Sequence, residues 1–429
     1  MENKIAQEKI YGFSHIHKEG FSYYLSFFIW PFGVTLAALR HWKSPWSKNV
    51  FWLFCIFFGF AFIIAEEGGA DSDRYARLFI QYAHSHLNIG ELFDSFYKSG
   101  SNYLDIASPL LTYLVSRFTV NPSVLFAVFG LIFGYFYSRN IWYILERLDR
   151  KITGIIFIYI ITFILLNPIW NINGFRMWTA AQIFLFGALP YLLEGNRKRL
   201  LWAGFSIFFH FSFFYPFGIL MLYILLRNRL NIYMGFFIVT AFIKEIDLIQ
   251  VRSALMFLPE IFHRKIINYT NPQYAELIDE LHQIYNSWYF TLSDDGLRWV
   301  IYLLAIFVFV FGRNILKEKK GLTKLFCFSL LLYGFANLSS LVPGGARFIT
   351  IASTFMFAFF IMLFNAYPEM KGLLLVLILS MPFIFLFCAV NIRAGMDYYG
   401  LMLIFGNPII AALPIEQSPL IIGIKKLIL

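Results

Sequence analysis

The chain has 429 residues, of which 59% are apolar and 21% aromatic, while only 14% are charged. Soluble globular domains average about 45–50% apolar and about 25% charged residues, so this composition excludes a soluble domain. The net charge of +10 would suit a nucleic-acid-binding protein, but the basic residues gather in short loops between apolar runs, so we expect no nucleic-acid partner. The composition predicts one all-α, polytopic integral membrane domain over residues 1–429.

Apolar runs of about 20 residues, the length that crosses a bilayer, recur along the chain and predict about 12 or 13 transmembrane helices. Helices are predicted because a backbone in lipid must satisfy its own hydrogen bonds. In chain order the runs are Phe21–Leu39, Val50–Ala65, Pro122–Leu145, Ile152–Trp170, Phe175–Leu193, Leu200–Leu226, Ile232–Ile249, Leu297–Phe311, Thr323–Val342, Phe348–Phe364, Gly372–Asn391 and Leu401–Leu413. The first 20 residues are polar, which predicts insertion by the first runs without a cleavable signal peptide.

Basic loops predict the orientation of these helices. Arg40–Lys48, Arg147–Lys151 and Arg313–Lys324 are assigned to the cytoplasm, because lysine and arginine concentrate there. This leaves two longer outer loops, 66–121 and 251–296. We expect both to carry interfacial helices, at Ile106–Val120 in the first loop and at the amphipathic Gln273–Tyr285 in the second.

The run Leu200–Leu226 lies between two strongly basic segments, Arg197–Arg199 and Arg227–Arg229. If both segments face the cytoplasm, the run is a hairpin of two short helices that breaks between His210 and Pro216, and the amino-terminal tail faces outward. One long helix is the alternative, and it would place one basic segment outside.

A polar element, Asp71-Ser-Asp73-Arg74-Tyr75, follows the second run on the predicted outer face. Two carboxylates two residues apart suit a divalent cation, or one of them suits a general base while Arg74 holds a phosphate. The competing interpretation is a solvated loop that caps the next helix.

Arg176 and Arg347 each open an apolar run on the same predicted face, after a glycine-containing turn. Arginines at a membrane boundary often only reach toward the headgroups. Here, however, they lie on the outer face, where the positive-inside rule makes arginine uncommon. They also lie at helix amino termini, where backbone N–H groups favour anions. Together they suggest a clamp for a diphosphate.

His210 lies about ten residues into its run, roughly 15 Å from the edge if the helix is continuous. A histidine at that depth is costly in lipid and marks a candidate site, as a proton donor or acceptor to a phosphate oxygen. A neutral histidine hydrogen-bonded between helices is the competing interpretation. The three cysteines lie in apolar runs without metal-ligand spacing, and no nucleotide-binding motif is present, so we expect no cofactor and require no metal, while Asp71 and Asp73 leave a metal site open.

Several segments resemble EpsG-like polysaccharide polymerases. FGFAFIIAEEGGADSDRYARLF is similar to the family's span that ends before an Asp-x-x-Arg-Tyr element, and NYLDIASPLLTYLVSRF is similar to its outer helix. GFRMWTAAQIFLFGALPYLLEGNRKRLLWAGFSIFFHFSF resembles the family's arginine-led span, basic turn and His-x-Ser element, here Arg176, Arg197–Arg199, and His210 with Ser212. GGARFITI resembles a late arginine-led span that begins at Arg347.

The resemblance implies a Wzy-type enzyme of the bacterial plasma membrane that joins polyprenyl-diphosphate-linked oligosaccharides at the outer face. Membrane lipid and other polysaccharide export proteins are further candidate partners. By this scheme the catalytic residues are Asp73, His210, Arg176 and Arg347, and the substrate-binding residues are Asp71, Arg74, Tyr75 and Ser212. A GT-C-like architecture is compatible with the same features.

Two other functions stay open. The first is a glycosyltransferase that uses a polyprenyl-phosphate sugar and employs the Asp71–Asp73 element as a base or metal site. The second is a flippase or transporter for the lipid-linked unit, which would more often show matching interrupted spans in two halves. The sequence shows one interrupted run, around His210, and polar residues gathered on one predicted face.

Overall fold

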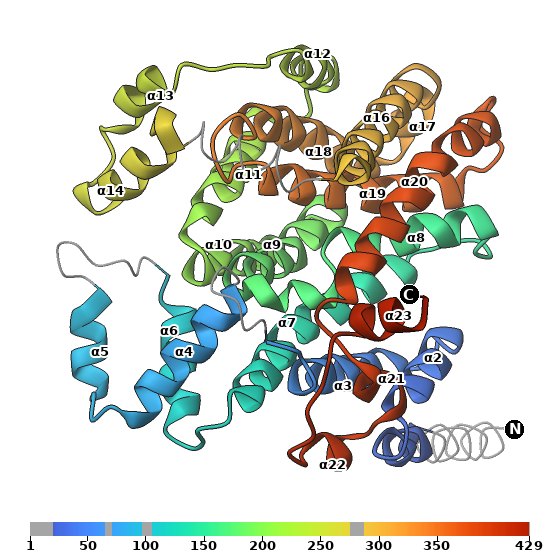
Figure 1. Cartoon of the computed structure of the whole chain (residues 1–429). Coiled ribbons are helices and arrows are strands. Elements are labelled where there is room, and N and C mark those ends of the chain that lie inside the picture. The colour runs from blue at the N-terminus through green and yellow to red at the C-terminus, as the bar shows by residue number, and fades with distance from the viewer. Residues whose placement is uncertain (1–19, 65–70, 97–104, 275–286, 429) are drawn as a thin grey trace, which may run out of the picture.

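The computed structural model describes residues 20–64, 71–96, 105–274 and 287–428, which form helices and no strand (Figure 1). The all-α prediction is therefore confirmed. The predicted helix Gln273–Tyr285 lies almost entirely outside the described residues, as does the amino-terminal tail.

The helices of the first half are α2 (Pro31–Arg40), α3 (Ser47–Phe60), α4 (Asp71–His84), α5 (Ile89–Phe96), α6 (Ala107–Ser116), α7 (Pro122–Leu145), α8 (Gly154–Leu166), η1 (Ile169–Gly174), α9 (Phe175–Glu194), η2 (Arg197–Arg199), α10 (Leu200–Phe209), η3 (Phe211–Phe213) and α11 (Phe214–Leu226). The second half contains α12 (Leu230–Ala241), α13 (Leu248–Leu255), α14 (Glu260–Tyr269), α16 (Trp288–Phe311), α17 (Arg313–Glu318), α18 (Lys320–Ser339), α19 (Arg347–Ala366), α20 (Leu373–Gly395), α21 (Leu401–Phe405), α22 (Pro408–Ala411) and α23 (Leu420–Ile428).

Five helical stretches of the described chain are long and apolar enough to cross a membrane: Pro122–Leu145, Gly154–Glu194, Lys320–Ser339, Arg347–Ala366 and Leu373–Gly395. The second comprises α8, η1 and α9, since the helix is interrupted after Leu166. Other predicted spans are shorter or broken: Val50–Ala65 overlaps the 14-residue α3, which ends at Phe60, and Leu401–Leu413 divides into α21 and α22. The polytopic prediction is confirmed, whereas the predicted number of spans is larger than these five.

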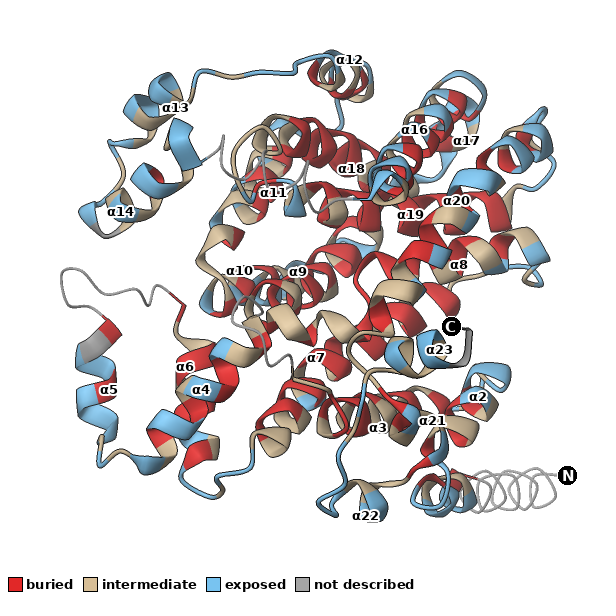
Figure 2. Cartoon of the chain, viewed as in Figure 1, coloured by how far each residue is buried: buried red, intermediate tan, exposed pale blue. Residues whose placement is uncertain are grey.

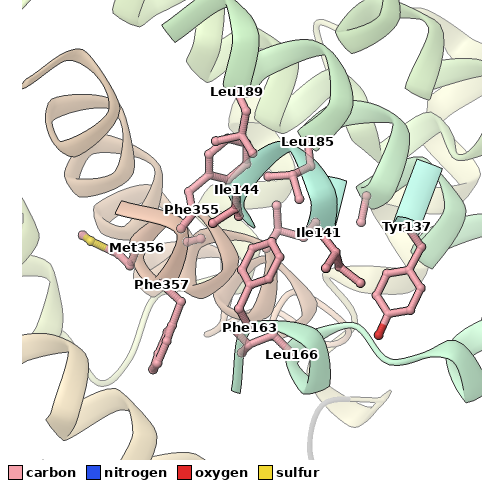
Figure 3. Close-up of a cluster of buried hydrophobic side chains, with 14 of the residues drawn as sticks. Tyr137, Ile141, Ile144, Phe163, Leu166, Leu185, Leu189, Phe355, Met356 and Phe357 are labelled. Atoms are coloured by element: carbon pink, nitrogen blue, oxygen red, sulfur yellow. The ribbon is translucent and has the colours of Figure 1, made fainter. Parts of the chain in front are cut away.

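Helix α19 lies at the centre of the bundle, where it packs against α8, α9, α16 and α18. Figure 2 shows it and α18 as largely buried, while α13 and α14 are mostly exposed. The core is built from large side chains of several helices, including Phe163 of α8, Leu185 of α9 and Phe355 of α19 (Figure 3). By contrast, α20 exposes Leu374, Leu375 and other apolar side chains, which suits a helix that faces lipid.

The predicted hairpin in Leu200–Leu226 is confirmed, because the chain reverses at His210. Helix α10 packs along α9 and ends with the Phe209 ring 6.1 Å from that of Phe175, at the start of α9. Helix α11 then returns along α18. The Tyr215 hydroxyl donates to the Phe335 carbonyl late in α18, and the Tyr223 ring packs edge-on against Phe328, closer to the start of α18.

Basic loops lie together at the end of the bundle away from His210. Arg147 pairs with Glu194 at the end of α9, and the backbone N–H of Arg150 donates to Asn365 near the end of α19 at 3.0 Å. Helix α19 has 20 residues, which span about 30 Å at 1.5 Å per residue. Arg347, its first residue, therefore lies at the opposite end from these loops.

Candidate functional site

His210 forms the tip of the hairpin. Its backbone is extended (φ −150°, ψ 117°), which ends α10 and starts η3. The backbone N–H of Ser212 donates to His210 Nδ1 at 3.3 Å, and the Ser212 hydroxyl lies 2.6 Å from the same nitrogen. Because Nδ1 accepts a backbone N–H, the neutral ring carries its proton on Nε2. His210 is thus arranged to donate through Nε2.

Arg176 is held by two partners from the first predicted outer loop. Its Nη1 donates to Asp105 Oδ2 at 3.0 Å, and its Nε donates to the Tyr75 hydroxyl at 3.2 Å. Asp105 is only 4% exposed, and its other oxygen accepts the N–H of Phe211 at 2.7 Å. Burial raises the pKa of the Tyr75 phenol, which keeps this partner neutral. Asp105 therefore joins Arg176 directly to the His210 turn.

The two acidic residues of the Asp71–Tyr75 element lie in the first turn of α4, where the helix dipole favours negative charge. Asp71 pairs with Arg74, and Asp73 pairs with Arg77 at 3.0 Å. Residues two positions apart lie on opposite sides of a helix, so the carboxylates do not converge on one point. Within the described residues, no three His, Cys, Asp or Glu side chains are grouped to hold a metal.

Arg347 lines a cavity of about 330 Å³ between η1, α9, α16, α19 and α20. Arg298 and Asp294 of α16 line the same cavity, together with Trp178 and the amides of Asn171 and Asn391. In the described part of the chain, Arg347 makes no hydrogen bond or ion pair and its side chain is exposed. The cavity thus offers two arginines, a carboxylate and neutral polar groups around an open space.

Asp294 precedes the apolar part of α16 and faces this cavity. Its side chain is accessible, but the surrounding protein atoms reduce its hydration and raise the pKa of the carboxyl. The charge of Arg298 opposes that shift. A carboxylate with a raised pKa is a stronger base than an ordinary exposed aspartate.

Helix α9 links the Arg176 network to the Arg347 cavity. Arg176 belongs to the network, and Trp178, two residues later, lines the cavity. The charged side chains of Asp105, Arg176, Arg347 and Lys265 all lie close enough to interact electrostatically with His210. The two sets of residues therefore form one polar region at the same end of the bundle.

The structure brings the predicted Tyr75, Arg176, His210 and Ser212 into one network and places Arg347 in the adjoining cavity. Asp71 and Asp73 pair with arginines of their own helix. Four residues of this region were not predicted from the sequence: Asp105, Lys265, Asp294 and Arg298. The only early signal for Asp105 is its position in NYLDIASPLL, a polar residue between apolar neighbours.

A family comparison covers this whole region. The model of the EpsG family matches residues 50–402, which is most of the chain. The chain belongs to the EpsG family. Every residue of the His210 network and of the Arg347 cavity lies inside the matched range. No curated protein and no solved structure matches the chain.

EpsG proteins are Wzy-like polysaccharide polymerases, and membership supports a polymerase-type role for this multi-pass membrane protein. For an EpsG-family member, the substrates implied are lipid-linked oligosaccharides in the membrane. The polar region described above is built from helices that the family match includes.

Proposed function

We propose that the chain joins polyprenyl-diphosphate-linked oligosaccharide repeat units into a surface polysaccharide at the outer face of the bacterial plasma membrane. The observation that carries this proposal is the cavity in which Arg298 and Arg347 lie beside Asp294. The family supports polymerisation, and the two arginines support an anionic donor. The basic loops at the opposite end support an outward-facing cavity, because such loops stay in the cytoplasm.

The reaction requires attack by a hydroxyl oxygen of the acceptor unit on the anomeric carbon of the donor glycan. The bond from that carbon to the diphosphate oxygen breaks, and polyprenyl diphosphate leaves with the bonding electrons. Arg298 and Arg347 stabilise the charge that grows on the leaving oxygen, because both line the cavity that would receive the diphosphate. Preorganised donors of this kind typically contribute about 10²–10³ in rate.

The attacking hydroxyl also loses a proton. Asp294 is our candidate acceptor, because its carboxyl lines the cavity and has a raised pKa. The two bases predicted from the sequence are less available: Asp73 pairs with Arg77, and His210 Nδ1 accepts from Ser212.

The remaining groups bind and orient the substrates. Trp178 offers an apolar face for a sugar ring, and Asn171 and Asn391 offer amides for its hydroxyls. His210 donates through Nε2 to a phosphate or hydroxyl oxygen, and Arg176 with Asp105 keeps the His210 turn in position.

Reconstitution tests the proposal. The purified protein in lipid vesicles receives a polyprenyl-diphosphate-linked repeat unit, without nucleotide or added metal, and the products are resolved on a gel. We expect a ladder of multiples. Arg347→Ala should slow its formation by about 10²–10³, and Arg347→Lys should recover part of the rate because the charge returns without the bidentate fork.

Arg313→Ala is the matched control, because Arg313 is an exposed arginine that opens α17 in the basic segment Arg313–Lys324. It should form the ladder at the wild-type rate. An unchanged ladder in Arg347→Ala would remove Arg347 from the mechanism. Movement of the lipid-linked unit across the bilayer without any ladder would instead identify a transporter.

A further inference from the structure

A second cavity, of about 520 Å³, lies beside the His210 turn, between η3 and α11 on one side and α13 and α14 on the other. Its lining is almost entirely apolar and includes Leu255, Leu258, Phe262 and Phe348. Among the described residues that line it, Lys265 is the only charged one. The cavity therefore combines a long apolar wall with a single cation.

This cavity adjoins the candidate site. Phe211 and Ser212 line it, and the same two residues bond to Asp105 and to His210. Phe348, which also lines it, directly follows Arg347 in α19. The polar region thus lies directly beside an apolar space.

Lys265 lies at the polar side of this cavity. Burial lowers the pKa of its ammonium group, and the nearby positive charge of Arg176 lowers it further, while Asp105 acts in the opposite direction. A half-buried lysine among arginines is electrostatically unfavourable until an anion arrives. The surroundings of Lys265 therefore favour a negatively charged group at this point.

We propose that this cavity binds the isoprenoid chain of the lipid-diphosphate substrate, with Lys265 contacting the phosphate at its polar end. The inference rests on the proposed function and names the part of the substrate that this cavity holds. A free sugar or phosphate would leave the apolar wall of the cavity exposed to water. An uncharged hydrocarbon would leave the positive charge of Lys265 without a counter-ion. The volume falls within the roughly 300–1,000 Å³ of small-molecule sites, so the cavity holds the chain segment next to the diphosphate.

The proposal predicts that the chain adds affinity beyond that of the diphosphate. Each buried methylene of a ligand strengthens binding severalfold, and the three isoprenoid units of farnesyl diphosphate are short enough to serve as a soluble probe. We therefore expect wild-type protein in nanodiscs of neutral phosphatidylcholine to bind farnesyl diphosphate at least about tenfold more tightly than inorganic diphosphate. Calorimetry against empty nanodiscs removes the contribution of the lipid itself.

Leu255→Trp tests the apolar wall, because the larger side chain fills the cavity from α13. It should abolish most of the preference for farnesyl diphosphate and leave the affinity for inorganic diphosphate unchanged. Met256→Trp is the matched control: the neighbouring side chain is 39% exposed and does not line the cavity. The control should keep the full preference.

Lys265→Gln tests the polar end and does not depend on how Leu255→Trp folds. It should weaken the binding of farnesyl diphosphate and of inorganic diphosphate by a similar factor. The preference for farnesyl diphosphate should therefore be preserved. An unchanged preference in Leu255→Trp, or unchanged affinities in Lys265→Gln, would overturn the proposal. So would displacement of farnesyl diphosphate by an equal concentration of phosphatidylglycerol, since the cavity would then be a general lipid site.

These measurements require no glycosyl transfer. A missing polymer ladder together with a chain-dependent affinity would therefore reject the proposed polymerase and keep a lipid-diphosphate site. A normal ladder with no chain dependence would reject this cavity alone.

Discussion

Asp105 uses both carboxylate oxygens inside the protein, one on Arg176 and one on the backbone of Phe211. It is therefore the residue that connects the first predicted outer loop to the tip of the hairpin. A buried ion pair is a weak source of net stability, but removing one partner leaves the other charge uncompensated. Asp105 thus serves mainly to hold Arg176 and His210 in position.

Asp105→Asn should disturb that arrangement more than it disturbs the fold. The amide keeps one acceptor but loses the charge that matches Arg176, so we expect a loss of about 1–3 kcal/mol in the free energy of unfolding. Polymer formation should fall by at least about tenfold, because a displaced turn misplaces His210. Thermal unfolding and the reconstituted ladder measure the two effects.

Asp94→Asn is the control for this change, because Asp94 is an exposed acid on α5. It should alter neither the unfolding midpoint nor the ladder. Wild-type behaviour of Asp105→Asn in both measurements would show that Arg176 and His210 hold their positions without it.

Sequence reasoning identified the candidate-site residues that stand at the ends of apolar runs or deep inside one. Arg176, Arg347 and His210 are conspicuous because charge and imidazole are costly at those places. Asp105 and Lys265 lie in the two predicted outer loops, where polar residues are ordinary, and their importance comes from partners about 70 to 160 positions away. Arg298 and Asp294 were visible as charges, but only packing shows that they share a cavity with Arg347.

At the scale of helices, the length of an apolar run predicts a span best where the helix is uninterrupted. Pro122–Leu145 agrees with α7 at both ends, and the run Phe175–Leu193 is one residue shorter than α9. The run Ile232–Ile249 continues too far, because α12 ends at Ala241 and Asp247 caps α13 instead. Hydropathy counts Ile246 and Ile249 as apolar but cannot detect that new helix start.

Close helix contacts also follow from small residues. Gly130 and Gly134 of α7 are four residues apart, and a Cβ added to Gly130 would lie 2.2 Å from the Cys55 carbonyl oxygen of α3. Small residues at this spacing let membrane helices approach backbone to backbone. The contact between α3 and α7 therefore depends on the absence of a side chain at Gly130.

Gly130→Ala should lower the free energy of unfolding by roughly 1–3 kcal/mol, the usual cost of overfilling a packed interface. The clash is with backbone, so side-chain movement cannot relieve it. Gly235→Ala in α12 is the matched control, since nothing lies within 4 Å of the added Cβ. There we expect no loss, or a gain of about 0.5–1 kcal/mol from helix propensity. Equal midpoints for the two variants in thermal unfolding would contradict the close-approach argument.

At the scale of the whole molecule, the basic loops and the candidate site lie at opposite ends of the helix bundle. Arg147 and Arg150 contact the carboxyl ends of α9 and α19, whereas Arg176 and Arg347 open the same two helices. The positive-inside rule assigns the first end to the cytoplasm. A polymerase whose product is a surface polysaccharide needs its cavity at the other end, so orientation and proposed function require each other.

Cysteine labelling tests this orientation in intact cells. The natural cysteines Cys55, Cys327 and Cys388 are buried, so the unmodified chain should react little with a membrane-impermeant maleimide. Ser253→Cys places an exposed thiol on α13, beside the apolar cavity, and it should react at once. Asn196→Cys places one in the basic turn after α9, and it should react only after the membrane is permeabilised. The reverse labelling pattern would place the cavity on the cytoplasmic side of the membrane. A lipid-linked donor for surface polymerisation could not reach it there, so this result would contradict both the orientation and the proposed function.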